Sequence, residues 1–272
     1  MIYHYTDLNA AKSITENAQV WLTDYRFLND KEEFTNGYEV LLDALDEYRN
    51  YAEKYPKDFI DDIANAVEFI RGAGFQVCER NNIFVASFSQ IPDLLSQWRS
   101  YGMYSLELDD EFFRDDEVVV LNCHYLHHPN DALNYADNLI AEYILPELMS
   151  VWDRNKSFVS VELSSLIDIY ALSFKHAAFC DENEIRFVIS CSSDDERINY
   201  RVKGNLLIPY IPFKFEPQLL KSITIGPIDN QELACQSLSM FAGKVSEKVQ
   251  QEQSDIEYCL VVENSDIPYR NI

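Results

Sequence analysis

Three short segments of the chain alternate polar with apolar residues, and this period of two predicts β-strands. They cover residues 2–6, 83–89 and 184–191, with Glu182 just ahead of the last one. Because alternate strand positions face the same side, each strand should gather its polar side chains on one face. Such faces are costly to bury against a core, so we expect them to meet at one functional cleft. The polar side chains concerned are His4, Thr6, Ser87, Ser89, Glu182, Glu184 and Arg186.

Longer segments place apolar residues three and four positions apart, which predicts amphipathic helices. The clearest apolar stripe consists of Phe34, Tyr38, Leu41, Leu45 and Tyr48. Asp30 and Glu33 match a capping box at the start of that helix. Pro146 should break or kink the helical stretch 131–154, and Gly102 should end a short helix in the left-handed conformation. The other expected helices cover about 9–16, 60–70, 93–101, 160–177 and 229–250.

The remaining strands are short and irregularly spaced, which favours an α+β fold over a doubly wound parallel sheet. Neither GxGxxG nor GxxxxGK[ST] occurs, so no phosphate-binding loop opens a βαβ unit. We therefore expect two small, mainly antiparallel sheets packed together with helices around them, in a single domain over 1–272 with a helical insertion at about 31–75. Residues 104–108 and 117–121 should pair with each other. Further strands are expected at 20–23, 206–210, 221–225 and 258–262.

Composition limits the classes of partner. The 272 residues, 47% of them hydrophobic, suffice for a sizeable core. A formal charge of −24, from 46 acidic and 22 basic residues, opposes binding of generic duplex DNA and suits solubility or a basic partner. A local basic strip of Lys203, Lys214 and Lys221 stays possible. The chain contains neither a signal-peptide pattern nor an apolar run of the roughly 18 residues that span a bilayer, so a cytoplasmic protein without a membrane is expected.

Metal and thiol chemistry are not expected. The six cysteines form no CxxC motif and are best read as buried free thiols. His124, His127 and His128 form the one histidine cluster, but no nearby acid or cysteine completes a ligand set. The sequence therefore predicts no metal.

The candidate site residues each have a plain structural alternative. Glu182 and Glu184 lie on one face, and repulsion between their carboxylates should raise the pKa of one of them. The alternative is an exposed, solvated strand face. The apolar run after Arg186 favours a strand inside the sheet. Trp98 and Tyr101 are spaced i, i+3, which is more often core than ligand platform. His4 alone is more often satisfied by a backbone carbonyl than by a ligand.

Several motifs nevertheless resemble the DUF2971 family of bacterial proteins over nearly the whole chain. They are His4-Tyr5-Thr6, Asn29 to Glu33, Ser87-Phe88-Ser89, Asp93 to Tyr101, Lys175 ahead of Glu182-x-Glu184-x-Arg186, and Ser265 to Arg270. The chain departs from the family after Tyr101, where Gly102-Met103-Tyr104 replaces a Gly-rich run. The order of the motifs is similar to that of the ADP-ribosyltransferase fold, and this likeness implies an enzyme that uses NAD.

The resemblance implies a role for each residue. Glu184 would bond the ribose 2′-hydroxyl and stabilise the oxocarbenium-like cation, Ser87 would orient Glu184, and Glu182 would act as base for the acceptor. The residues expected to bind NAD are His4, Tyr5, Thr6, Ser89, Trp98, Tyr101 and Arg186. His4, Ser87 and Glu184 should meet in one cleft, with Glu182 nearer the rim and Trp98 or Tyr101 as a wall.

The implied function is an NAD-dependent ADP-ribosyltransferase or NAD glycohydrolase, a toxin of bacterial conflict or antiviral (anti-phage) defence. Its partners would be a protein, nucleotide or small-molecule acceptor and a cognate neutralising protein. The alternative is a non-catalytic nucleotide-binding or partner-binding regulatory module that keeps the same cleft.

Overall fold

The computed structural model describes residues 1–28, 31–47, 54–73, 82–113, 115–155, 160–253 and 257–268. The fold is mixed α+β with a mainly antiparallel sheet, as the sequence predicts. Some predictions fall on positions or side chains outside this description. They are the motif residues Asn29 to Glu33 with the capping box, the stripe position Tyr48, and the motif residues Tyr269 and Arg270.

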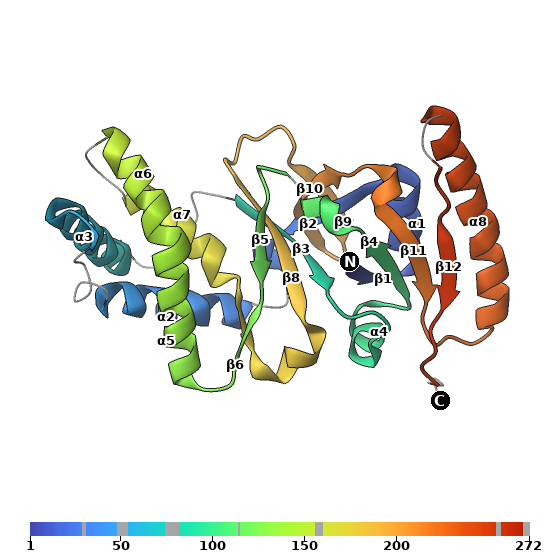
Figure 1. Cartoon of the computed structure of the whole chain (residues 1–272), viewed down its shortest axis with the longest axis horizontal. Helices are drawn as coiled ribbons and strands as arrows, with labels where there is room; N and C mark the ends of the chain where they lie inside the picture. The colour runs from blue at the N-terminus through green and yellow to red at the C-terminus, as the bar shows by residue number, and fades with distance from the viewer. Residues whose placement is uncertain are drawn as a thin grey trace.

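One sheet dominates the molecule (Figure 1). Ten strands of the described chain follow the order β12-β11-β4-β1-β3-β2-β10-β9, with β8 on the other edge of β3 and β5 beside β8. Their bounds are β1 Ile2–Thr6, β2 Gln19–Asp24, β3 Asn82–Ser89, β4 Tyr104–Leu108, β5 Val119–Asn122, β8 Glu184–Cys191, β9 Asn199–Lys203, β10 Leu206–Lys214, β11 Leu220–Ile225 and β12 Val261–Asn264. A small parallel pair joins β6 His124–Leu126 to β7 Phe174–His176.

The expected pair of small sheets is instead one sheet that forks at β3. β8 pairs with β3 along its full length on one edge. The other edge is shared: β2 pairs at Phe84 and Val85, and β1 pairs only at Ser89. The segment 86–88 therefore has no strand partner on that edge among the described residues. Here β1 and β2 diverge.

The expected pairing of 104–108 with 117–121 is wrong. β4 lies between β1 and β11, and β5 pairs with β8 on the far side of β3. The connection between β4 and β5 contains the 3₁₀ turn Asp110–Phe113, and it is long enough to carry the chain to another part of the sheet. Consecutive strands pair dependably only where a tight turn joins them, as in the β9–β10 hairpin.

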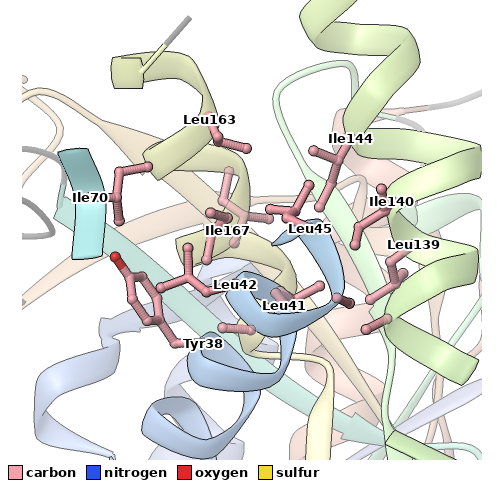
Figure 2. Close-up of a cluster of buried hydrophobic side chains, with 14 of the residues drawn as sticks. Tyr38, Leu41, Leu42, Leu45, Ile70, Leu139, Ile140, Ile144, Leu163 and Ile167 are labelled. Carbon is pink, nitrogen blue, oxygen red and sulfur yellow. The ribbon is translucent and has the colours of Figure 1, made fainter. Parts of the chain in front are cut away.

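Two hydrophobic clusters hold the fold together. The first lies in a helical lobe at one end of the sheet and includes Leu41, Ile70 and Ile167 (Figure 2). The second joins the sheet to α1 (Leu8–Asn17) and α8 (Gln231–Glu252), and it includes Leu22 and Leu106. The helices of the lobe are α2 Lys31–Glu47, α3 Lys57–Ala73, α5 Pro129–Leu139, α6 Leu145–Asn155 and α7 Ser160–Ala171. The lobe thus combines the expected insertion at 31–75 with a later part of the chain.

The stripe is confirmed at Phe34, Tyr38, Leu41 and Leu45, which are all buried. The helical stretch 131–154 is interrupted as expected, by a π-helical turn at Ile140–Ile144 just before Pro146. Proline lacks the amide hydrogen that would continue the α-helical pattern, and the wider turn accommodates its ring.

Two helix ends differ from expectation. The helix expected to reach 177 stops at Ala171, because the next residues form β7 and the 3₁₀ turn Ala177–Glu182. Gly102 ends the short helix α4 (Leu95–Tyr101) with φ 134° and ψ 174°, a positive-φ extended conformation and not the left-handed helical one. No helix in the described ranges combines the length and apolar character that crossing a membrane requires.

Candidate functional site

A cleft of about 680 Å³ opens where the sheet forks. Its walls come from β1, α1, β2 and β3, with side chains added from α4, from β9 and from the turn before β8. This volume lies in the range of roughly 300–1,000 Å³ found for small-molecule sites. The predicted site residues that line it are His4, Tyr5, Thr6, Ser87, Ser89, Tyr101, Glu182 and Glu184. Strands far apart in sequence therefore meet at one cleft, as the polar faces predicted.

His4, on β1, connects that strand to β3 at the fork. Its Nδ1 lies 3.0 Å from the carbonyl oxygen of Ser87, one of the residues without a strand partner on that edge. A carbonyl only accepts, so Nδ1 carries the hydrogen and Nε2 is left as an acceptor. Burial lowers the pKa of His4, and the bond to Ser87 offsets only part of that effect. The imidazole is therefore neutral at pH 7.

Glu182 and Glu184, which line the cleft, belong to a buried ion cluster of two acids and two bases. Lys175 Nζ donates to Oε2 of Glu182 and to Oε2 of Glu184. Arg186 Nε donates to Glu184 Oε1 at 2.8 Å, and its Nη1 donates to the carbonyl oxygen of Leu172 at 2.8 Å. All four charged side chains are buried. Because two positive charges balance two negative ones, the cluster tolerates a burial that any single member would not.

The cluster reverses the expected pKa shift. Burial alone would raise the pKa of Glu184, but Arg186 and Lys175 outweigh it and lower the pKa to about 2. Burial alone would lower the pKa of Lys175, but Glu184 and Glu182 outweigh it and raise the pKa. The expected repulsion between the carboxylates is overcome because a lysine bridges them. Glu184 is thus firmly ionised and held in one orientation.

Glu182 is no more exposed than Glu184. The two residues are 5% and 7% exposed. Glu182 ends a 3₁₀ turn, and Asn183 at φ 42° connects it to the strand that Glu184 begins. The two carboxylates share a side because Lys175 binds both, and not because both stand on a strand.

The two serines have different surroundings. Ser89 Oγ donates to the carbonyl oxygen of Glu182 at 2.7 Å and accepts from the amide of Ile91 at 3.0 Å. It therefore fixes the turn that carries Glu182. Ser87 lies opposite Arg186 in the register of β3 and β8, while Ser89 lies opposite Glu184. The role of orienting Glu184, expected for Ser87, falls to Lys175 and Arg186.

Trp98 and Arg186 do not line the cleft. Trp98 is 1% exposed, and its Nε1 donates to Asp93 Oδ1 at 2.9 Å. The indole packs edge-on against Tyr5 at 4.7 Å, so it is a core residue. Tyr101, at 47% exposed, is the aromatic wall. Arg186 is 1% exposed and pairs with Glu184, so it can act on the cleft through that carboxylate.

Tyr5 and Asp93 tie the motif segments together. The Tyr5 hydroxyl donates to the carbonyl oxygen of Ile91 at 2.9 Å and accepts from the amide of Leu94 at 3.0 Å. Asp93 also accepts from the Ser265 hydroxyl and, at 3.0 Å, from the amide of Asp266. Two motif pieces far apart in sequence thus meet in a structural contact. Tyr5 lines the cleft but is held by these bonds.

Sequence reasoning missed three contributors to this site. Lys175 entered only as a motif letter, because its three-residue strand was taken for the end of a helix. Arg201 was not singled out, and Lys203 was noted only as part of a basic strip; both line the cleft. The alternation in 199–203 is the signal that would have found them.

The histidine cluster has structural contacts. His124 stacks on Tyr135 with ring centroids 4.2 Å apart, and His128 caps α5 together with Asp131. Within the described ranges, no group of three or more His, Cys, Asp or Glu residues is arranged to hold a metal ion.

Comparisons of the chain with protein-family models, with curated proteins and with solved structures find no match. The resemblance to the DUF2971 family therefore stays a prediction. The function has to be argued from the geometry of the cleft.

Proposed function

We propose that the chain is an NAD-consuming enzyme, an ADP-ribosyltransferase or NAD glycohydrolase, with the cleft at the sheet fork as its NAD site. The observation that carries the proposal is the meeting of His4, Ser87 and Glu184, from three different strands, in one cleft of about 680 Å³. The further setting, a toxin of bacterial conflict or antiviral defence with a cognate neutralising protein, rests on the resemblance alone.

Glu184 is the proposed cation-stabilising group. Cleavage of the bond between nicotinamide and ribose sends the bonding electrons to nicotinamide and leaves an oxocarbenium-like cation on the sugar. A fixed carboxylate beside that carbon lowers the barrier by stabilising the charge. Its pKa of about 2 keeps Glu184 ionised, so it acts through charge and not by proton transfer. Lys175 and Arg186 hold it in place and act as positioning residues.

The other side chains complete the reaction. Nε2 of neutral His4 accepts a hydrogen bond from a ribose hydroxyl, and Tyr101 offers a ring surface to nicotinamide or adenine. Water or an acceptor then attacks the cationic carbon. Glu182, whose Oε2 is bonded to Lys175, receives the proton of that nucleophile.

One observation favours a second candidate, the non-catalytic nucleotide-binding or regulatory module. Lys175 bonds both carboxylates, and Arg186 adds a second cation against Glu184. These cations compete with a developing positive charge on the ligand. In a pure binding protein the cluster would only shape the floor of the cleft.

The two candidates are separated by incubating the protein with NAD labelled in the nicotinamide ring, with and without cell lysate. The enzyme reading expects release of label by the wild type and a loss of roughly 10²-fold or more in Glu184→Gln. Glu182→Gln should spare simple hydrolysis more than transfer to an acceptor. A wild type that binds NAD but releases no label under any condition contradicts the enzyme reading and leaves the binding module.

A stability control is needed because Glu184→Gln also unbalances the ion cluster. The double variant Glu184→Gln with Lys175→Gln removes one charge of each sign. It should recover stability relative to Glu184→Gln without recovering turnover. If turnover returns together with stability, Glu184 has a structural role only.

A further inference from the structure

The far end of the cleft is built on one face of the β2–β10–β9 part of the sheet. In the register Thr23 faces Tyr210, and Trp21 faces Pro212. The opposite face carries Leu22 and buries it in the sheet core. On β9 the same alternation brings Arg201 and Lys203 to the cleft, where both line it with Trp21 and Thr23.

Arg201 is held firmly in this place. Its Nη2 donates to Thr23 Oγ1 at 2.9 Å. The guanidinium lies over the rings of Trp21 and Tyr210, at 5.4 and 6.0 Å from their centroids, and the two rings pack at 4.3 Å. Its Nε is buried and has no hydrogen-bond partner in the described part of the chain. Burial lowers the pKa of Arg201.

This arginine differs from Arg26 and Arg71, which bind carboxylates. Arg26 bonds Asp24 at 2.6 Å, and Arg71 bonds Asp43 at 2.7 Å. No ion pair joins Arg201 or Lys203 to a carboxylate anywhere in the described ranges. In a chain with 46 acidic and 22 basic residues, two cations on one cleft wall without an acidic partner stand out. A half-buried guanidinium without an anion is costly, and an anionic ligand would remove that cost.

We propose that Arg201 and Lys203 form a phosphate-binding subsite for a nucleotide that occupies the cleft. Arginine's planar fork suits phosphate oxygens, and lysine adds a mobile point charge beside it. Trp21, Tyr210 and Thr23 pre-organise the guanidinium, so little conformational freedom is lost on binding. The subsite rests on the proposed function only where the nucleotide is NAD; any nucleotide with phosphates would use it.

The test is calorimetric titration of the protein with ADP-ribose, ADP, inorganic pyrophosphate and adenosine. The wild type should bind ADP-ribose and ADP more tightly than adenosine. Arg201→Gln should weaken binding of ADP by about 10- to 100-fold, the range for a charge-assisted contact, and leave adenosine unchanged. Lys203→Gln should weaken the binding of ADP several-fold. Binding of pyrophosphate alone would show that the subsite takes phosphate without the nucleoside.

Lys221→Gln is the matched control. Lys221 lies on β11, a strand that contributes nothing to the cleft lining, and pairs with Asp109 at 3.1 Å. The variant therefore removes one positive charge away from the cleft. It should bind ADP as the wild type does. Melting temperatures show whether Arg201→Gln stays folded. If it unfolds, the test rests on Lys203→Gln, because Lys203 is exposed and its replacement should not disturb the fold.

The results separate this proposal from the NAD-consuming function. A wild type that binds ADP in an Arg201-dependent way but never cleaves NAD supports the subsite and contradicts the enzyme. The protein could instead cleave NAD while Arg201→Gln and Lys203→Gln bind ADP as tightly as the control Lys221→Gln. That result overturns the subsite and leaves the enzyme standing. The subsite is also overturned if the wild type binds none of the phosphate-bearing probes, or binds adenosine as tightly as ADP.

Discussion

Protonation of His4 makes the stability of the protein depend on pH. Burial holds its folded pKa below the ordinary value of 6.5, so the unfolded chain takes up the proton first as the pH falls. Stability is complete above pH 6.5 and declines below it. Asn at this position can still donate to the Ser87 carbonyl but cannot titrate. We expect His4→Asn to flatten the decline, measured by denaturant unfolding across pH. An unchanged pH profile in the variant would contradict this account of His4.

Glu184 gives a second prediction for single residues. Glu184→Gln leaves Lys175 and Arg186 short of one negative charge and should cost about 3–5 kcal/mol at pH 7, the usual range for breaking a buried pair. The folded pKa of about 2 lies below the ordinary 4.5, so this contribution is present above pH 4.5 and is lost as the pH falls through 2. Wild type and variant should therefore converge in unfolding free energy over that window. A constant difference would show that the charge of Glu184 is not responsible.

The junction of α4 and β1 depends on one glycine. At Gly102 φ is 134°, and a Cβ there would clash with the carbonyl oxygen of Thr6 at the end of β1. Gly204, in the turn between β9 and β10, also has a positive φ, of 60°, but has open space around it. Gly102→Ala should therefore destabilise the protein clearly more than Gly204→Ala, for which backbone strain of about 1–2 kcal/mol is expected. Equal losses of stability in thermal unfolding would contradict a clash at Gly102, because backbone strain alone would then explain both variants.

Elements were predictable where a local pattern dictates them. Strand alternation located β1, β3 and β8, and the spacing of the stripe located α2. Long-range pairing has no such signal: β4 was assigned to β5 although it lies between β1 and β11. Lys175 was missed as the bridge between two carboxylates because its short strand was taken for the end of a helix, and Arg201 was missed although the alternation in 199–203 indicates a strand. What no local pattern shows is the contact of Arg201 with Thr23 on β2, which is distant in sequence.

The whole molecule carries a charge of −24, and the cationic cluster at Arg201 and Lys203 is a local exception. A duplex needs an extended row of phosphate contacts, and the net charge repels it at long range. We therefore expect no binding of generic duplex DNA at physiological salt in a fluorescence anisotropy titration. Micromolar binding that weakens steeply with added salt would show that a basic face outweighs the net charge.

The central claim is that the fork of the sheet is the NAD site, and a crystal structure of Glu184→Gln grown with saturating NAD tests it most directly. The account predicts one NAD molecule in the cleft, with its phosphates at Arg201 and Lys203 and its nicotinamide ribose beside residue 184. NAD bound elsewhere, or placed with neither its phosphates at Arg201 nor its ribose near residue 184, would contradict the account. So would an empty cleft in crystals of a variant that is folded and exposed to NAD.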